Sequence, residues 1–250
     1  MDYTIAQEFV LPSKGLIYDK EINPNIKLRS MTTNEEMKRL AYTETPYKTL
    51  CEIIDDCLVV KPGISSYDMC IGDYQFLLHR LRMVTYGTDY STQSVCPYCG
   101  ELYKTEIKLD ELPLLELDER IDDLLEFTLP VTKKRIKLRV QTPRMMDEVA
   151  LRKKAMQERH GINTKGDISL LLLIDSLIEK VDGQAVDSIK LEQFIRTLPM
   201  RDTNKIIKTA EKISLKVGID TLQHNVCVHC GGKFDSSFRI TSEFFGPTED

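Results

Sequence analysis

Several features that would point directly to a function are missing from this sequence of 250 residues. Its longest apolar run, Leu170 to Ile174, is far too short to span a bilayer. The formal net charge is −5, so no overall basic excess attracts nucleic acid or an anionic membrane. The first residues lack a basic segment followed by an apolar one, so we expect no secretory signal. These absences predict a chain with neither a membrane nor a nucleic acid as its partner.

The motifs of common catalytic sites are also missing. The sequence has no G-x-S-x-G, no H-E-x-x-H, no H-x-E paired with P-C-x-x-C and no glycine-rich dinucleotide turn. The segment Pro12-Ser13-Lys14-Gly15 is reminiscent of a phosphate loop but lacks the first glycine and the Gly-Lys-Ser/Thr end. We therefore expect no enzymatic activity and no small-molecule substrate. An enzyme with an unrecognised site stays as an alternative.

Two short cysteine pairs are the strongest chemical feature. Cys96-Pro97-Tyr98-Cys99 and Cys227-Val228-His229-Cys230 are each followed at once by glycine, and 127 residues separate the two pairs. Each C-x-x-C turn places two sulfurs on one side of a tight loop, and two turns supply the four thiolates of a closed structural zinc site. The pattern predicts one structural Zn²⁺, bound by Cys96, Cys99, Cys227 and Cys230.

The segments that flank the two pairs form a weak internal repeat. Counted from the first cysteine of each pair, the same apolar or glycine positions recur in both. These matched positions are Val95 and Val226, Gly100 and Gly231, Tyr103 and Phe234, Ile107 and Phe238, and Leu109 and Ile240. The odd offsets place the last three pairs on one strand face. We therefore expect two β-hairpins that share an apolar flank, the arrangement of a zinc ribbon split by a long insertion.

Other readings of the cysteines remain open. The two turns could pack together without metal, or the pairs could be redox centres, although no thioredoxin-like βαβ pattern surrounds them. His224 and His229 lie beside the second pair, and His229 is an alternative ligand only if one of the four cysteines does not bind the metal. The three remaining cysteines, Cys51, Cys57 and Cys70, are expected to pack in the core.

The rest of the chain reads as α+β. The expected fold is a mostly helical body with an N-terminal β-hairpin region and the split four-cysteine ribbon. Phe9 to Tyr18 reads as strand, turn and strand, and Ile26–Arg29 reads as a further strand. The expected helices begin at Thr33 with a capping box to Glu36, then cover Pro46–Val59, Gly72–Tyr86, Pro143–Gln157, Ile168–Lys180, Asp187–Leu198 and Asp202–Val217. In the third of these, Arg80 and Arg82 are expected to point outward.

Composition also indicates how the chain is divided. An acidic stretch, residues 110–126, precedes a basic strand, Lys133–Val140, whose charges we expect to form a solvated face. The predicted units are 1–87 (β-hairpin and helices), 88–109 with 219–245 (the two halves of the ribbon), 110–218 (an inserted strand and helical body) and 246–250 (a flexible tail).

Two motifs in the first third carry a resemblance to a known family. The first is L-P-S-K-G at 11–15 with a tyrosine after it, followed by I-x-L-R-x-M-T-x-x-E-E at 26–36. The second is D-x-x-x-L-L-x-x-L-R at 73–82, followed by Gly87. This pattern resembles the T4-like bacteriophage baseplate protein family, most clearly over residues 9–100. In phage relatives, a C-P-x-C-G turn after this helix and a second near the C-terminus is a familiar elaboration.

The resemblance implies a non-enzymatic phage tail protein. Its expected role is a baseplate hub component or an assembly factor, such as a chaperone of the tape-measure protein, with other tail or baseplate proteins as partners. Its expected place is the host cytoplasm during assembly and the baseplate of the virion tail. The alternative is a cellular zinc-ribbon protein that binds nucleic acid or a transcription or translation complex. Against it, the basic residues of the ribbon, such as Lys104 and Lys233, are balanced by nearby acids.

Overall fold

The computed structural model describes residues 4–160, 168–238 and 242–245, and the fold is α+β. The described helices are α1 (Thr33–Leu40), α2 (Pro46–Cys57), α3 (Ile71–Tyr86), α4 (Asp122–Leu125), α5 (Pro143–His160), α6 (Ser169–Leu177), α7 (Ser188–Thr197) and α8 (Met200–Ser214), with 3-10 turns η1 (Ser66–Asp68), η2 (Leu109–Glu111) and η3 (Ser242–Phe245). The described strands are β1 (Ala6–Val10), β2 (Asn25–Arg29), β3 (Leu58–Val60), β4 (Asp89–Val95), β5 (Leu102–Lys108), β6 (Leu114–Leu115), β7 (Glu126–Thr128), β8 (Arg135–Leu138), β9 (Ile178–Val181), β10 (Gly218–Ile219), β11 (Leu222–Val226) and β12 (Lys233–Ser237).

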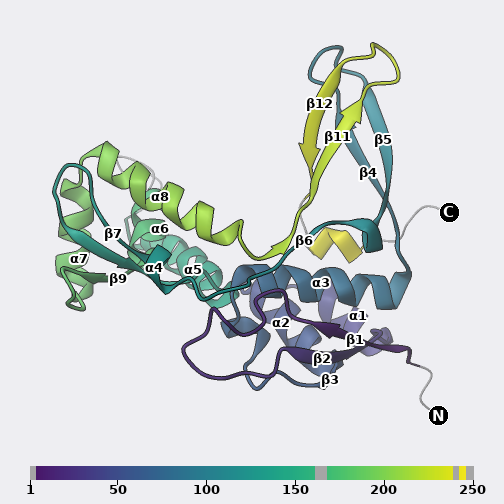
Figure 1. The fold of residues 1–250 in the computed structure, drawn as a ribbon, viewed down its shortest axis with the longest axis horizontal. Helices are drawn as coiled ribbons and strands as arrows, with labels where there is room; N and C mark the ends of the chain where they lie inside the picture. Colours follow the sequence, from purple (N-terminus) through teal and green to yellow (C-terminus); the bar gives the residue numbers. More distant parts are fainter. Residues whose placement is uncertain (1–3, 161–167, 239–241, 246–250) are drawn as a thin grey trace.

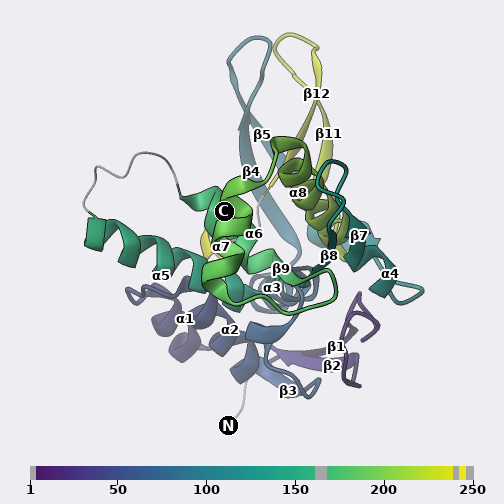
Figure 2. The same cartoon turned by 90° about the vertical axis from the view of Figure 1, so that its left-hand side faces the viewer.

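The elements form a base, a lobe and an arm (Figure 1). The base joins the antiparallel sheet β1-β2-β3 to α1, α2 and α3, and the lobe joins the sheet β7-β8-β9 to α4 through α8. The arm consists of the hairpins β4-β5 and β11-β12, which rise together from the base and lie side by side in both views (Figure 2). In the described part of the chain, no helix is both long enough and apolar enough to cross a membrane.

Helix α3 is the centre of the core. Phe76, Leu77 and Leu81 are almost fully buried, as their spacing predicts. Its first turn approaches the backbone of the lobe so closely that a Cβ atom on Gly72 would lie 2.2 Å from the carbonyl oxygen of Val217. Only glycine permits this contact, because any side chain at this position would overlap the backbone. The three isolated cysteines, Cys51, Cys57 and Cys70, are buried, as expected.

The N-terminal region differs from its expected form. Strand β1 pairs with β2, from Ala6↔Arg29 to Val10↔Asn25, whereas residues 16–18 form turns rather than a return strand. The cause is a buried anchor on α3. The carboxylate of Asp73 accepts hydrogen bonds from the Ser13 hydroxyl at 2.5 Å, the Ser13 N–H at 3.0 Å and the Tyr18 hydroxyl at 2.6 Å. Three donors fold residues 11–18 over the start of α3, so these residues cannot extend beside β1.

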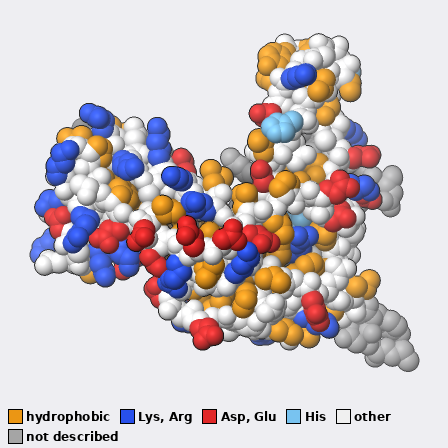
Figure 3. Space-filling view, viewed as in Figure 1, with side chains coloured by type: hydrophobic (Ala, Val, Ile, Leu, Met, Phe, Trp, Pro, Cys, Tyr) orange, Lys and Arg blue, Asp and Glu red, His pale blue; other side chains and the backbone are white. Residues whose placement is uncertain are grey.

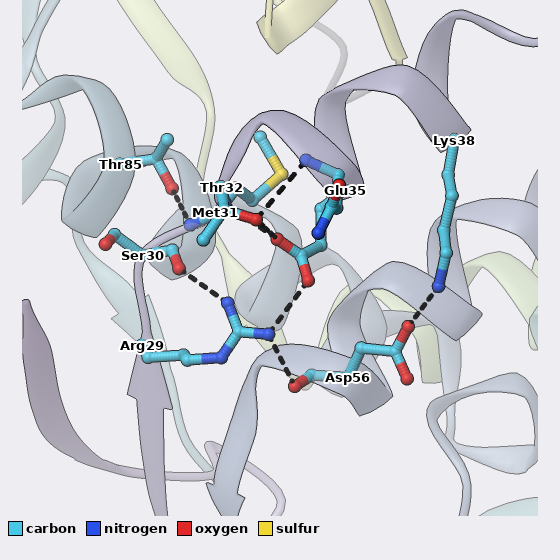
Figure 4. Close-up of polar contacts among 9 residues, drawn as sticks. Arg29, Ser30, Met31, Thr32, Glu35, Lys38, Asp56 and Thr85 are labelled. Carbon is cyan, nitrogen blue, oxygen red and sulfur yellow. Dashed lines mark hydrogen bonds and ion pairs between the residues drawn. The ribbon is translucent and has the colours of Figure 1, made fainter. Parts of the chain in front are cut away.

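The capping box of α1 lies one residue earlier than expected. The N-cap is Thr32, and its partner is Glu35 rather than Glu36. Glu35 accepts from the Thr32 N–H at 2.7 Å and also binds Arg29 at 2.8 Å, so the cap is joined to β2 (Figure 4). Arg29 in turn donates to the Asp56 carbonyl at the end of α2. Chiefly through the Arg29 hydrogen bond, the pKa of Glu35 falls to about 2.

Arg82 is buried and does not point outward as expected, although Arg80 is partly exposed. Its Nε donates to the Phe244 carbonyl at 2.8 Å and its Nη1 to the Gly87 carbonyl at 3.2 Å. The guanidinium also lies over the rings of Tyr90, at 4.9 Å from the centroid, and Phe244, at 5.3 Å. Cation–π contacts of this kind offset part of the desolvation of a buried arginine. Arg82 therefore joins α3 to η3.

The lobe has the four helices expected between residues 143 and 217, with different bounds, and the short helix α4 in addition. Helix α6 ends at Leu177, whereas the expected helix continued to Lys180. Ile178–Val181 is instead strand β9 on the edge of the sheet. Tertiary pairing with β8 overrides the helical periodicity here, because Ile178 and Val181 are β-branched and suit a strand. On β8, Ile136 and Leu138 are buried, whereas Arg135 is exposed and ion-paired, so the solvated charged face is confirmed. The expected flexible tail, residues 246–250, lies outside the described residues.

Glu35→Gln tests the link between α1, β2 and α2. Because the folded pKa of Glu35 is lowered from 4.5 to about 2, its stabilisation is present above about pH 4.5 and is lost as the pH falls towards 2. We expect Glu35→Gln to lower the free energy of unfolding by about 1–3 kcal/mol at neutral pH. Urea unfolding at several pH values measures this. The difference from the native chain should shrink on acidification, and the exposed Glu21→Gln should change stability by less than about 0.5 kcal/mol.

Candidate metal centre

The two cysteine turns at the tip of the arm have the same backbone geometry. In the first, the Cys96 N–H donates to Glu101 O at 3.0 Å and the Gly100 N–H donates to Cys96 O at 2.9 Å. In the second, the same bonds run from Cys227 to Gly232 and from Gly231 to Cys227, both at 2.9 Å. The glycines after the pairs have φ of 75° and 72°, a conformation that favours glycine. The weak repeat in the sequence is therefore a repeat in structure.

The four sulfur atoms meet between the two turns. Cys96, Cys99, Cys227 and Cys230 place their Sγ atoms within 4.8 Å of one another. Across the turns, Cys96 Sγ lies 3.8 Å from Cys230 Sγ, and Cys99 Sγ lies 3.7 Å from Cys227 Sγ. Four sulfurs bound at about 2.3 Å to a tetrahedral zinc ion would be about 3.8 Å apart. These two distances already have the required value, so the cluster could bind a metal ion of that size.

Backbone N–H groups favour the thiolate form of the first cysteine in each turn. Burial opposes ionisation of Cys96, but N–H groups of Cys99 and Tyr98 outweigh it and lower its pKa to about 7. The N–H groups of Cys230 and His229 likewise hold the pKa of Cys227 below its usual value. Thiolates are the form that binds metal, so the turns prepare both residues as ligands.

The shared apolar face that the offsets predict is present between the two hairpins. The rings of Tyr103 and Phe234 are 5.9 Å apart in an edge-on arrangement, and the Tyr103 hydroxyl donates to Asn225 Oδ1 at 3.2 Å. Nearer the base, the rings of Tyr90 and Phe238 are 5.5 Å apart. Ile107 and Leu109 are buried, whereas Ile240 lies outside the described residues. The hairpins therefore contact one another along their length as well as at the cysteines.

Two residues of the site were not identified from the sequence. Tyr98 lies across the second turn and donates its hydroxyl hydrogen to the Lys233 carbonyl at 3.1 Å. Its ring lies so close to Gly232 that a Cβ atom there would be 2.5 Å from Tyr98 Cδ2. The double glycine at 231–232 is the sequence signal for this contact, because one glycine serves the turn and the other admits the ring.

The histidines beside the second turn do not join the cluster. His224 Nδ1 lies 2.7 Å from Asp235 Oδ1, on the exposed surface of the arm. His229 is exposed, and the cluster of potential ligands found in the described residues contains cysteines alone. The cysteines therefore provide a complete set of four ligands without a histidine.

Comparison with known proteins identifies the family. The sequence matches the family model described as T4 bacteriophage base plate protein over residues 4–246. The chain belongs to this family. No curated protein and no solved structure matches it. The sequence motifs showed the resemblance mainly over residues 9–100. The family match covers nearly the whole chain, so it includes the helical lobe and the arm as well. A phage baseplate-related protein is thus favoured over a cellular zinc-ribbon protein.

The motif residues of this baseplate protein have structural roles. Ser13 of the first motif donates to Asp73 of the second, so the two motifs meet at one buried contact. Arg82, at the end of the second motif, binds η3. No catalytic arrangement is needed to account for these residues.

Gly232→Ala tests the contact between the turns. We expect the added methyl group to displace the Tyr98 ring and to lower the melting temperature by a few degrees, equivalent to about 1 kcal/mol. Combining Gly232→Ala with Tyr98→Ala removes the clash, so the double variant should be no less stable than Tyr98→Ala alone. Thermal unfolding of the four proteins measures the coupling, and additive losses would contradict a direct contact.

Proposed function

We propose that this protein is a non-enzymatic baseplate hub component or assembly factor whose arm is held together by one structural zinc ion. Family membership over residues 4–246 is the observation that carries the proposal. The four-sulfur cluster supports the metal, and the exposed arm supports a role in contacts with other tail proteins. Chaperoning of the tape-measure protein is one form that such an assembly role would take.

Zinc is the metal that suits the ligands best. Four thiolates in a tetrahedral arrangement select soft or borderline ions, of which zinc is the usual structural choice. A site closed by Cys96, Cys99, Cys227 and Cys230 leaves no coordination position for water or a substrate, so the ion would act as a structural link rather than a catalyst. This is the chemical basis of the proposed non-enzymatic role.

The long interval between the turns is compatible with such a link. Loop-closure entropy rises only with the logarithm of length, so the 127 intervening residues add little cost over a shorter insertion. Structural zinc in small peptide sites contributes about 10 kcal/mol of apparent binding free energy. The ion would therefore join the two halves of the ribbon and hold together the two ends of the predicted inserted body, residues 110–218.

The tip of the arm offers an apolar surface for contact with a partner. Tyr98 and Val228 belong to the two cysteine turns, and they are 68% and 79% exposed. Val95, Leu102 and Val226, on the adjoining strand ends, are also exposed. Apolar side chains grouped on a projecting surface are typical of protein interaction sites. A metal that fixes the two turns would fix this surface as well.

Metal analysis tests the zinc site. Freshly purified protein should contain about one zinc per chain, and chelation should lower the melting temperature and loosen the arm. Much less than one metal ion per chain would contradict the proposal. A Cys96→Ser, Cys227→Ser variant should lose the metal, whereas Cys51→Ser, in the core of the base, should retain it.

Phage assembly tests the proposed role. In a phage that lacks this gene, the native chain supplied from a plasmid should restore infectious particles, and the Cys96→Ser, Cys227→Ser variant should restore at least tenfold fewer. Cys51→Ser is the matched control and should behave as the native chain does. Unimpaired assembly without the gene would overturn the role. Co-purification with the tape-measure protein alone would identify the chaperone form, and presence in mature particles would identify the component form.

A further inference from the structure

Charge is strongly segregated along this chain. Residues 127–217 contain 19 Lys and Arg against 11 Asp and Glu, a net charge of +8. The remaining residues contain 15 Lys and Arg against 28 Asp and Glu, a net charge of −13. The overall charge of −5 therefore conceals a basic segment, which forms the lobe except for α4 and Glu126 of β7, within an otherwise acidic chain. Such an asymmetry favours association with a surface of complementary charge.

Five basic residues of the lobe follow one face of α8 and the turn after it. We define the basic row as Arg201, Lys205, Lys208, Lys212 and Lys216, all exposed. Spacings of three and four residues place the first four on one helical stripe, about 17 Å long at 1.5 Å per residue, and Lys216 lies in the turn that follows α8. Among the described residues, no carboxylate forms an ion pair within 4.0 Å of these side chains. Figure 3 shows basic side chains gathered along the course of α8.

An acidic row lies beside the basic row. We define it as Glu116, Asp118, Glu119, Asp122, Asp123 and Glu126, all exposed. Helix α4, which carries two of these residues, packs against α8. Figure 3 shows acidic side chains crossing the molecule below the basic ones, over the segment that contains α4 and β6. Their described ion-pair partners are Lys14, Arg120 and Arg135. Three cations leave an excess of negative charge on this row.

We propose that this face binds a second copy of the chain around a two-fold axis that lies in the face and runs between the two rows, along the line that bisects them. Rotation by half a turn about such an axis exchanges the positions of the rows, so each basic row faces the partner's acidic row. A two-fold interface of this kind is self-complementary, and it is the commonest arrangement among homo-oligomers. The occupant is a second copy because this chain itself presents both charges in the required order.

A nucleic acid fits this face less well. A phosphate backbone along the basic row would lie beside the carboxylates of the acidic row and be repelled by them. Lys205 lies over the ring of Phe127, at 5.6 Å from the centroid, but the basic row itself contains no aromatic residue on which bases could stack. The favoured partner therefore carries positive and negative charge together.

The association should depend on salt, because exposed ion pairs are weak individually and are screened within about 8 Å at physiological ionic strength. Sedimentation velocity of the full chain should show a dimer at about 50 mM NaCl. The dissociation constant should rise at least tenfold at about 500 mM. A monomer at low salt and a protein concentration of about 100 µM would overturn the proposal, and so would assemblies that keep growing beyond two copies.

Charge reversal locates the interface. A basic-reversed variant carries Lys205→Glu, Lys208→Glu and Lys212→Glu, and an acid-reversed variant carries Glu119→Lys, Asp122→Lys and Asp123→Lys. Each alone should dimerise at least tenfold more weakly than the native chain. Both sets in one chain restore the net charge and exchange the two rows, so this swapped variant should dimerise again. Failure of the swapped variant to recover, while it remains folded, would overturn the two-fold pairing.

Matched controls separate this interface from general charge effects. Lys48→Glu, Lys61→Glu and Lys233→Glu, on other elements, change the net charge as the basic-reversed variant does and should leave the dimer intact. Circular dichroism and thermal unfolding confirm folding. If a reversed variant is unfolded, the salt dependence of dimerisation by the native chain is the test of the proposal. The proposal would be overturned in favour of nucleic acid by one further result. In it, the protein sediments as a monomer at low salt and binds a random DNA duplex through the basic row.

Discussion

The arrangement of this protein depends on a buried carboxylate at the start of α3. Asp73 receives three hydrogen bonds from residues 11–18, and burial raises its pKa despite them. A buried carboxylate with its donors removed is costly, so the loop and the helix must fold together. Arg82, at the other end of α3, has the same effect on η3, through a carbonyl hydrogen bond and aromatic rings. One helix therefore fixes two segments that lie at opposite ends of the sequence, and the arm begins where this helix ends.

Local patterns predicted the parts of the fold in which neighbouring residues decide the conformation. The apolar stripe of α2 was predicted from residue spacing, and Leu50, Ile53 and Ile54 are indeed all buried. The hairpins around the cysteines were predicted from spacing in the same way. The errors arose where a distant partner decides. Residues 16–18 have the composition of a strand, but Tyr18 is bound by Asp73, 55 residues away. Arg82 has the pattern of an exposed residue, but Phe244, 162 residues away, provides its environment.

The site shows the same division between local and distant information. Four cysteines in two C-x-x-C-G turns were sufficient to predict that their sulfurs meet, because each turn supplies two thiolates and a closed structural zinc site needs four. The placement of Tyr98 over Gly232 needs the relative position of the two hairpins, which no single turn specifies. The basic and acidic rows are likewise visible only once α4 is packed against α8, since about 80 residues separate them in the sequence.

The contact between Gly72 and Val217 has a mechanical consequence. At this point the backbone that leaves the lobe touches α3 with no side chain between them, so main-chain atoms alone set the spacing. The chain continues from Val217 through β10 directly into β11 of the arm. Because no side-chain rotamer can alter this spacing, the direction in which the chain sets out towards the arm is tied to the position of α3.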